Sequence, residues 1–269
     1  MTIDLHDYAQ VLFDMDGTVA IGEDAMPGAT EFVEACRNAG AAIGFITNAS
    51  LPTSNEIGKR LAAIGVGRPG DALMTSAIAL ADEIAENFST VVFAGQRGLR
   101  AALLAAGLEV VGADSARAAD LVGDDVAVAV GMFPHQIDAF TPNLVAFLRA
   151  GAPCYVPTME VNWPTPRGLK PGNGQTIAQL QALVAFEPIV CGKPSRVFAE
   201  RLRSRWHLRE PVLIVGDSLQ ADVALALDNG WDSILLLTGT TSHHDLDGRR
   251  PGATLVATDL LDALERTVV

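Results

Sequence analysis

A short apolar run that leads straight into two carboxylates constrains this chain most. Val11–Phe13 shows no polar alternation, which is typical of a central parallel strand covered on both faces. Asp14 and Asp16 follow at once, and Gly17 comes next. Alternate residues of an extended segment point the same way, so the two acids can face one small volume before the glycine turns the chain away. The pattern predicts a strand that delivers two acids to a site at its carboxyl end.

Strand and helix patterns alternate along the rest of the chain. Residues 28–40 show helical spacing of apolar side chains, and residues 41–46 form an apolar run that ends in Thr47 and Asn48. Further buried strands are expected at 90–94, 126–130, 212–215 and 234–237, with helical patterns before or after them. This alternation predicts an α/β fold with a doubly wound parallel sheet.

The pattern of strands and helices changes in the middle of the chain, which suggests a second domain. A length of 269 residues fits one large or two modest domains. We expect a core made of residues 1–78 and 186–269, with a smaller α/β domain, residues 79–185, inserted between them. The stretch 157–174 is rich in proline and glycine, and we expect it to be irregular, as a functional loop or a domain junction.

Composition excludes several classes of partner. The net charge of −13 argues against binding to a nucleic acid polymer or an anionic membrane, since both need clustered Lys and Arg. No apolar run reaches the roughly 18 residues that span a bilayer, and residues 1–10 show no secretory signal, so we expect a cytoplasmic protein. Cys36, Cys154 and Cys191 lie far apart and predict buried thiols rather than a disulfide framework or a zinc site.

Polar side chains follow several of the expected strands. In a doubly wound sheet such strand ends converge on one crevice. The side chains that this arrangement would gather are Asp14 with Asp16, Thr47 with Asn48, Lys193 ahead of a helix, and Asp217 with Asp222.

Such a crevice could process a phosphomonoester. A carboxylate at about 4 Å from a dianionic phosphate is repelled by roughly 8 kcal/mol at an effective dielectric near 20, so cations are required. Asp14 and Asp217 can hold Mg²⁺, Lys193 adds a positive charge, and Thr47 with its neighbour Asn48 can bind a phosphate oxygen. Attack by Asp14 would give an aspartyl-phosphate, while Asp16 could exchange protons with the leaving alcohol and with water.

The motifs in this order resemble those of the haloacid dehalogenase superfamily of phosphatases. The four matching segments are Asp14-Met15-Asp16-Gly17-Thr18, Thr47-Asn48, Lys193, and Gly216-Asp217-Ser218-Leu219-Gln220-Ala221-Asp222. The NagD-like group, subclass IIA, carries its cap domain between the second and third motifs. This chain is similar to it at Met26-Pro27-Gly28-Ala29, Thr47-Asn48-Ala49-Ser50, Pro171-Gly172-Asn173-Gly174 and Gly192-Lys193-Pro194-Ser195.

The resemblance implies a role for each site residue. Asp14 would be the nucleophile and Asp16 the acid and base, with Mg²⁺ held by Asp14, the main-chain carbonyl of Asp16 and Asp217. Lys193 would bind phosphate and steady the nucleophile, and Asp222 would be a supporting acid. The implied function is Mg²⁺-dependent hydrolysis of a small phosphomonoester, such as a sugar, polyol or nucleotide phosphate. Whether the protein forms a homo-oligomer is left open.

The chain departs from the pattern of this group in two places. Pro157-Thr158-Met159-Glu160 stands where the group often has Thr-Asn-Pro-Asp, and an acid that commonly follows Val-Gly-Leu in the group is absent after Val130-Gly131-Met132. Both changes lie in the cap, where they bear on substrate identity rather than on chemistry.

The alternative functions are a receiver-like phospho-accepting module, disfavoured by length and the inserted domain, and a non-catalytic phospholigand binder, disfavoured by the intact motifs.

Overall fold

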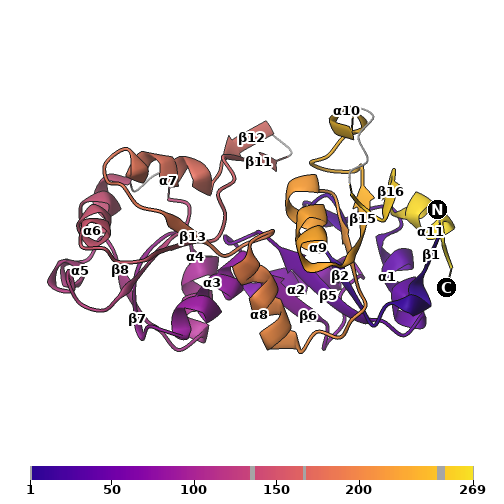
Figure 1. Ribbon diagram of the computed structural model, residues 1–269, viewed down its shortest axis with the longest axis horizontal. Helices are drawn as coiled ribbons and strands as arrows, with labels where there is room; N and C mark the ends of the chain where they lie inside the picture. The colour runs from indigo at the N-terminus through magenta and orange to yellow at the C-terminus, as the bar shows by residue number, and fades with distance from the viewer. Residues whose placement is uncertain (1, 134–136, 166–167, 247–251, 269) are drawn as a thin grey trace. The chain divides into compact units, whose positions relative to one another are not determined.

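The computed structural model describes residues 2–133, 137–165, 168–246 and 252–268, which form two compact units (Figure 1). The core unit comprises Met1–Thr47, Asn55–Met74 and Leu202–Val269, and the cap unit comprises Asn48–Ser54 and Thr75–Arg201. This division by contacts groups residues 48–54, 75–78 and 186–201 with the cap, whereas we predicted them in the core. The boundaries of the domains themselves stay a prediction.

The core unit is built on a six-stranded sheet to which both ends of the chain contribute (Figure 1). Its strand order is β16-β15-β14-β2-β5-β6, and the pairings from β16 through β5 are parallel. The strands are β2 (Gln10–Phe13), β5 (Ala42–Thr47), β6 (Ala72–Thr75), β14 (Val212–Gly216), β15 (Asp232–Leu236) and β16 (Leu255–Ala257). The order reverses between β2 and β14, which is where a doubly wound sheet binds its ligands.

Short helices and small strand pairs complete the core elements. The core contains the buried rings of Phe13, Phe32 and Phe45, whose centroids lie 6.1 Å apart for Phe13–Phe32 and for Phe13–Phe45. The other elements are β1 (Ile3–Asp4), η1 (Leu5–Asp7), β3 (Ala20–Ile21), β4 (Asp24–Ala25), α1 (Ala29–Asn38), α2 (Ser54–Ala63), η2 (Leu219–Val223), α9 (Ala224–Asn229), α10 (His243–Leu246), α11 (Leu260–Glu265) and β17 (Thr267–Val268). Helix α8 (Arg196–Trp206) is divided between the two units after Arg201.

The cap unit has a parallel five-stranded sheet of its own, in the order β13-β10-β9-β7-β8. Its strands are β7 (Thr90–Ala94), β8 (Glu109–Gly112), β9 (Ala127–Val130), β10 (Cys154–Val156) and β13 (Pro188–Val190). Its helices are α3 (Ser76–Ala85), α4 (Arg97–Ala105), α5 (Ala116–Asp120), α6 (Ile137–Arg149) and α7 (Asn173–Gln181). The predicted fold class, a doubly wound parallel core with an inserted α/β cap, is confirmed.

The stretch 157–174 is more regular than we expected. Within it β11 (Asn162–Thr165) and β12 (Gly168–Pro171) pair antiparallel, with Asn162 opposite Pro171 and Pro164 opposite Leu169. The prediction of an irregular segment was therefore wrong. In a two-stranded ribbon each strand has a free edge, and a proline can face that edge without breaking a ladder hydrogen bond.

The three cysteines are buried and free, as predicted. Burial raises the pKa of the Cys36 and Cys154 thiols to about 12 and also raises the pKa of Cys191. These thiols therefore stay protonated at neutral pH and are poor nucleophiles. Among the described residues, no helix is both long enough and apolar enough to cross a bilayer.

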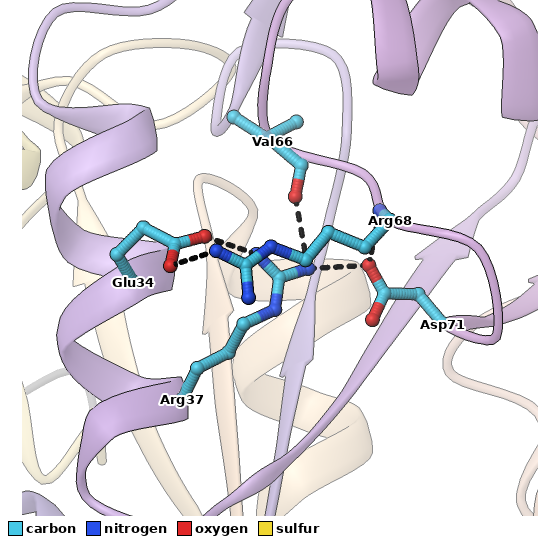
Figure 2. Close-up of polar contacts among 5 residues, drawn as sticks. All are labelled: Glu34, Arg37, Val66, Arg68 and Asp71. Carbon is cyan, nitrogen blue, oxygen red and sulfur yellow. Dashed lines mark hydrogen bonds and ion pairs between the residues drawn. The ribbon is translucent and has the colours of Figure 1, made fainter.

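A network of ion pairs ties α1 to the loop before β6 (Figure 2). The Arg37 guanidinium donates to Glu34 Oε1 at 2.6 Å, to the Val66 carbonyl at 3.0 Å and to Asp71 Oδ2. The Arg37 side chain is 11% exposed, whereas that of Arg68, which pairs with Glu34 at 2.5 Å, is 59% exposed. Arg37 is the buried member of the network and contacts both carboxylates and the Val66 carbonyl, so its loss removes the most interactions.

We expect Arg37→Ala to lower the free energy of unfolding by about 2 kcal/mol, because it removes a partly buried guanidinium that offsets two carboxylates and donates to the Val66 carbonyl. Arg68→Ala is the matched control and should cost less than about 1 kcal/mol, since its ion pair is solvated. Urea unfolding of both variants measures the difference. Equal losses for the two substitutions would contradict this account of the network.

Candidate active site

Two of the predicted acids leave the core sheet at the same level, on either side of the point where its strand order reverses. Phe13 of β2 pairs with Val215 of β14, and the Asp14 N–H donates to the Val215 carbonyl at 2.9 Å. Asp14 is 8% exposed and Asp217 is 3% exposed. Strand register therefore places both carboxylates at the carboxyl edge of the sheet, as the sequence predicted.

Asp222 completes a cluster with these two residues. One carboxylate oxygen each from Asp14, Asp217 and Asp222 lies within 4.8 Å of the others, and all three residues are buried. Two carboxylates at that separation repel by about 3.5 kcal/mol at an effective dielectric of 20, so a bound cation would stabilise the ionised cluster. Oxygen donors of this kind are those that Mg²⁺ prefers, and the donor set therefore fits that ion.

Glycines allow the backbone to close around the cluster. A Cβ at Gly17 would lie 2.9 Å from Asp217 Oδ2, and a Cβ at Gly239 would overlap the same oxygen. A Cβ at Gly216 would overlap the Asp222 carboxylate. Gly17 also has φ +94°, a conformation that L side chains rarely adopt. The positions of both carboxylates therefore depend on three residues without side chains.

The loop after β15 holds Asp217, and our sequence reasoning missed it. The Thr240 N–H donates to Asp217 Oδ2, and the Thr241 N–H donates to the Asp217 carbonyl at 3.1 Å. The Thr238 hydroxyl donates to the Gly17 carbonyl at 2.5 Å. The signal was available, because Thr238-Gly239-Thr240-Thr241 follows a buried strand just as the other motifs do.

Asp222 lies in a π-helical turn, η2, which follows β14. Its Oδ2 accepts from the Ser218 N–H at 3.1 Å, and the Ser218 hydroxyl accepts from the Ala221 N–H at 3.1 Å. Asp222 therefore stabilises the start of this turn and also contributes an oxygen to the carboxylate cluster.

Asp16 has a different environment from Asp14. Its side chain is 58% exposed and accepts from Arg60 Nη2 at 2.8 Å. The cluster does not include its carboxylate. An exposed acid can exchange protons with water, whereas the buried Asp14 is shielded. No local sequence pattern pointed to Arg60, which comes from α2 and meets Asp16 only in the folded core.

The predicted phosphate-binding residues fall in both units. Thr47 ends β5 of the core and is 3% exposed, while Asn48 and Lys193 belong to the cap unit. Within that unit, the Lys193 N–H donates to Asn48 Oδ1 at 2.8 Å, and Asn48 Nδ2 donates to the Lys193 carbonyl at 3.1 Å. Lys193 is 5% exposed. Hydrogen bonds between the Asn48 side-chain amide and the Lys193 backbone thus connect the second and third motifs.

Two family models match the chain. Residues 11–109 match the haloacid dehalogenase-like hydrolase model, and residues 190–263 match the HAD-hydrolase-like model. Together they cover the three carboxylates of the cluster and Asn48 with Lys193.

Two curated relatives cover most of the chain. An acid sugar phosphatase of Staphylococcus saprophyticus is 28% identical over 97% of this chain and 98% of its own length. A 5'-nucleotidase of Bacillus subtilis is 28% identical over 89% of this chain and 91% of its own.

Solved structures give the same picture. A 4-nitrophenylphosphatase of Thermotoga maritima has a TM-score of 0.85 at 25% identity, covering 97% of this chain and 98% of that one. A glycerol phosphate phosphatase of Mycobacterium tuberculosis in complex with magnesium scores 0.84 at 27% identity, covering 98% and 78%. NagD from E. coli scores 0.80 at 26% identity, covering 97% and 98%. The chain therefore belongs to the haloacid dehalogenase-like hydrolases, in their NagD-like group, and is a phosphatase of that family.

Proposed function

We propose that this phosphatase is a Mg²⁺-dependent hydrolase of small phosphomonoesters that works through an aspartyl-phosphate on Asp14. The observation that carries the proposal is the buried cluster of Asp14, Asp217 and Asp222 at the point where the core strand order reverses. A carboxylate can attack an anionic phosphate only where positive charge offsets their repulsion. The same cluster that presents Asp14 also offers oxygen ligands for a cation.

The covalent chemistry needs two carboxyl groups with different tasks. Asp14 attacks phosphorus, the ester P–O bond breaks, and Asp16 gives its proton to the departing oxygen. Water then attacks phosphorus and gives a proton to Asp16, while the bond between phosphorus and Asp14 breaks and phosphate leaves. The exposure of Asp16 supports this role, because its carboxyl can meet both the leaving alcohol and water.

The remaining residues would bind the metal and the phosphate. Asp14, Asp217 and the main-chain carbonyl of Asp16 would hold Mg²⁺, which supplies positive charge toward the phosphoryl oxygens when bound. Asp222 would keep the turn after β14 in place through its bond to the Ser218 N–H.

Positive charge and hydrogen-bond donors would come from the second and third motifs. Lys193 would bind the phosphate and offset the charge of the nucleophile, while Thr47 and Asn48 would contribute to the same phosphate site. Asn48 already supports Lys193 through both of its side-chain amide atoms.

The substrate class follows from the relatives and the cap. The curated relatives include a sugar phosphatase and a nucleotidase, and one solved relative is a glycerol phosphate phosphatase. We propose a sugar, polyol or nucleotide phosphate as the substrate. Residues 79–185 would form the cap domain that excludes water and selects the leaving group. A panel of such phosphates would identify the preferred one.

The assignments of the nucleophile and the metal can be tested together. Wild-type protein should hydrolyse 4-nitrophenyl phosphate with Mg²⁺ and lose that activity with EDTA. Asp14→Asn should reduce kcat by at least about a thousandfold, because the amide cannot form the acyl phosphate. Activity that survives Asp14→Asn would contradict the nucleophile assignment. Metal-dependent turnover would exclude a receiver module and a binding-only protein.

The role of the glycines around the carboxylate cluster can also be tested. Gly239→Ala would place a Cβ against Asp217 Oδ2 and should weaken Mg²⁺ binding by about tenfold or more, since metal ligands must keep their geometry. Gly58→Ala is the matched control, because its Cβ would meet nothing within 4 Å, and it should leave Mg²⁺ affinity unchanged. Calorimetric titration with Mg²⁺ measures both. An unchanged affinity in Gly239→Ala would contradict the metal-site assignment of Asp217.

A further inference from the structure

We propose that Glu160 is a positioning residue of the phosphatase, which acts through Asn48 to hold the backbone of Lys193. The proposal rests on the proposed function, in which Lys193 binds the phosphate. All three residues belong to the cap unit, so their mutual contacts are internal to it.

Asn48 clamps Lys193 at two points. Its Oδ1 accepts from the Lys193 N–H at 2.8 Å, and its Nδ2 donates to the Lys193 carbonyl at 3.1 Å. Both hydrogen-bonding groups of the Lys193 backbone are thereby engaged by one side chain. The amide works only in this orientation, because an exchange of its oxygen and nitrogen would face donor against donor and acceptor against acceptor.

Glu160 reinforces that orientation. Asn48 Nδ2 also donates to Glu160 Oε1, at 3.1 Å. An ionised carboxylate only accepts hydrogen bonds, so it favours the NH₂ end of the amide on its own side. With that end committed to Glu160 and to the Lys193 carbonyl, Oδ1 is left facing the Lys193 N–H. Hydrogen bonds to a charged acceptor are also about twice as strong as neutral ones.

The backbone on both sides of this contact is fixed by the cap. The Gly172 N–H donates to the Val161 carbonyl at 2.8 Å, and the Gly174 N–H donates to the Glu160 carbonyl at 2.9 Å. A Cβ on either glycine would overlap the backbone of residues 159–161. The glycine-rich start of α7, to which we had assigned no role from the sequence, therefore supports the segment that carries Glu160.

Asn48 is anchored as well. The buried Ser76 hydroxyl donates to the Asn48 carbonyl at 2.8 Å, and a Cβ at Gly192 would lie 2.6 Å from Asn48 Oδ1. The Gly98 N–H donates to the Leu51 carbonyl at 3.0 Å. Since both ends of the Glu160–Asn48 bond are supported, a small change in Glu160 is transmitted to Lys193 rather than absorbed by the loop.

The test measures phosphate binding as well as turnover. We would compare wild type with Glu160→Ala, Glu160→Gln, Asn48→Ala and the double variant, using 4-nitrophenyl phosphate for kinetics and inorganic phosphate as the binding probe, both with Mg²⁺. Asp125→Ala, which removes another exposed acid of the cap unit, is the control. Thermal unfolding of each variant separates misfolding from mispositioning.

Glu160→Ala should lower kcat/KM by about tenfold and weaken phosphate binding to a similar extent, as expected for the loss of one hydrogen bond to a charged acceptor. Glu160→Gln keeps an acceptor oxygen and should stay within about threefold of wild type. The double variant should be no worse than Asn48→Ala, because both changes remove the same support.

Three results would overturn the inference while Asp14→Asn remains inactive: an unaffected Glu160→Ala, equal losses in Glu160→Gln and Glu160→Ala, or additive losses in the double variant. In that case the proposed function would stand and Glu160 would have no part in it. Full activity in Asp14→Asn would instead refute the proposed function itself. The two failures are therefore distinguishable.

Discussion

The mutual repulsion of three buried carboxylates is the constraint on which the rest of this structure depends. Asp14, Asp217 and Asp222 each bring an oxygen within 4.8 Å of the others. The register between β2 and β14 places the first two there, and Gly216 and Gly239 approach Asp222 and Asp217 so closely that a Cβ at either position would overlap the carboxylate. Such a cluster costs free energy unless positive charge offsets it, which supports the proposal that it binds a metal ion.

The sequence predicted the parts of the fold that local pattern determines. The strand 90–94 was predicted at the bounds of β7, and the apolar runs at 11–13 and 212–215 became the central strands of the core. Short strands such as β13 and β16 were missed, because three residues carry too little periodicity and form strands only beside a neighbour. The contacts of Asp16 with Arg60 and of Asn48 with Glu160 join distant segments, so no local pattern encodes them.

The cap unit carries residues of the sequence motifs in addition to its own sheet. By contacts it includes Asn48 and Lys193, which belong to the second and third sequence motifs. The glycine-rich start of α7 supports residues 159–161, and Glu160 from that segment meets Asn48. The part of the chain expected to determine substrate choice thus also contributes to the position of Lys193, the lysine that we propose binds the phosphate. Substitutions in the cap can for that reason change rate as well as specificity.

The central claim is that Asp14 forms a covalent bond to phosphorus. Acid quenching of wild-type enzyme during turnover of a phosphomonoester, followed by mass spectrometry of its peptides, tests this most directly. The account predicts a phosphorylated peptide with the modification on Asp14, formed only with Mg²⁺ and lost as turnover ends. A modification on another residue, or turnover under conditions that trap a known aspartyl-phosphate enzyme but leave Asp14 unmodified, would contradict it.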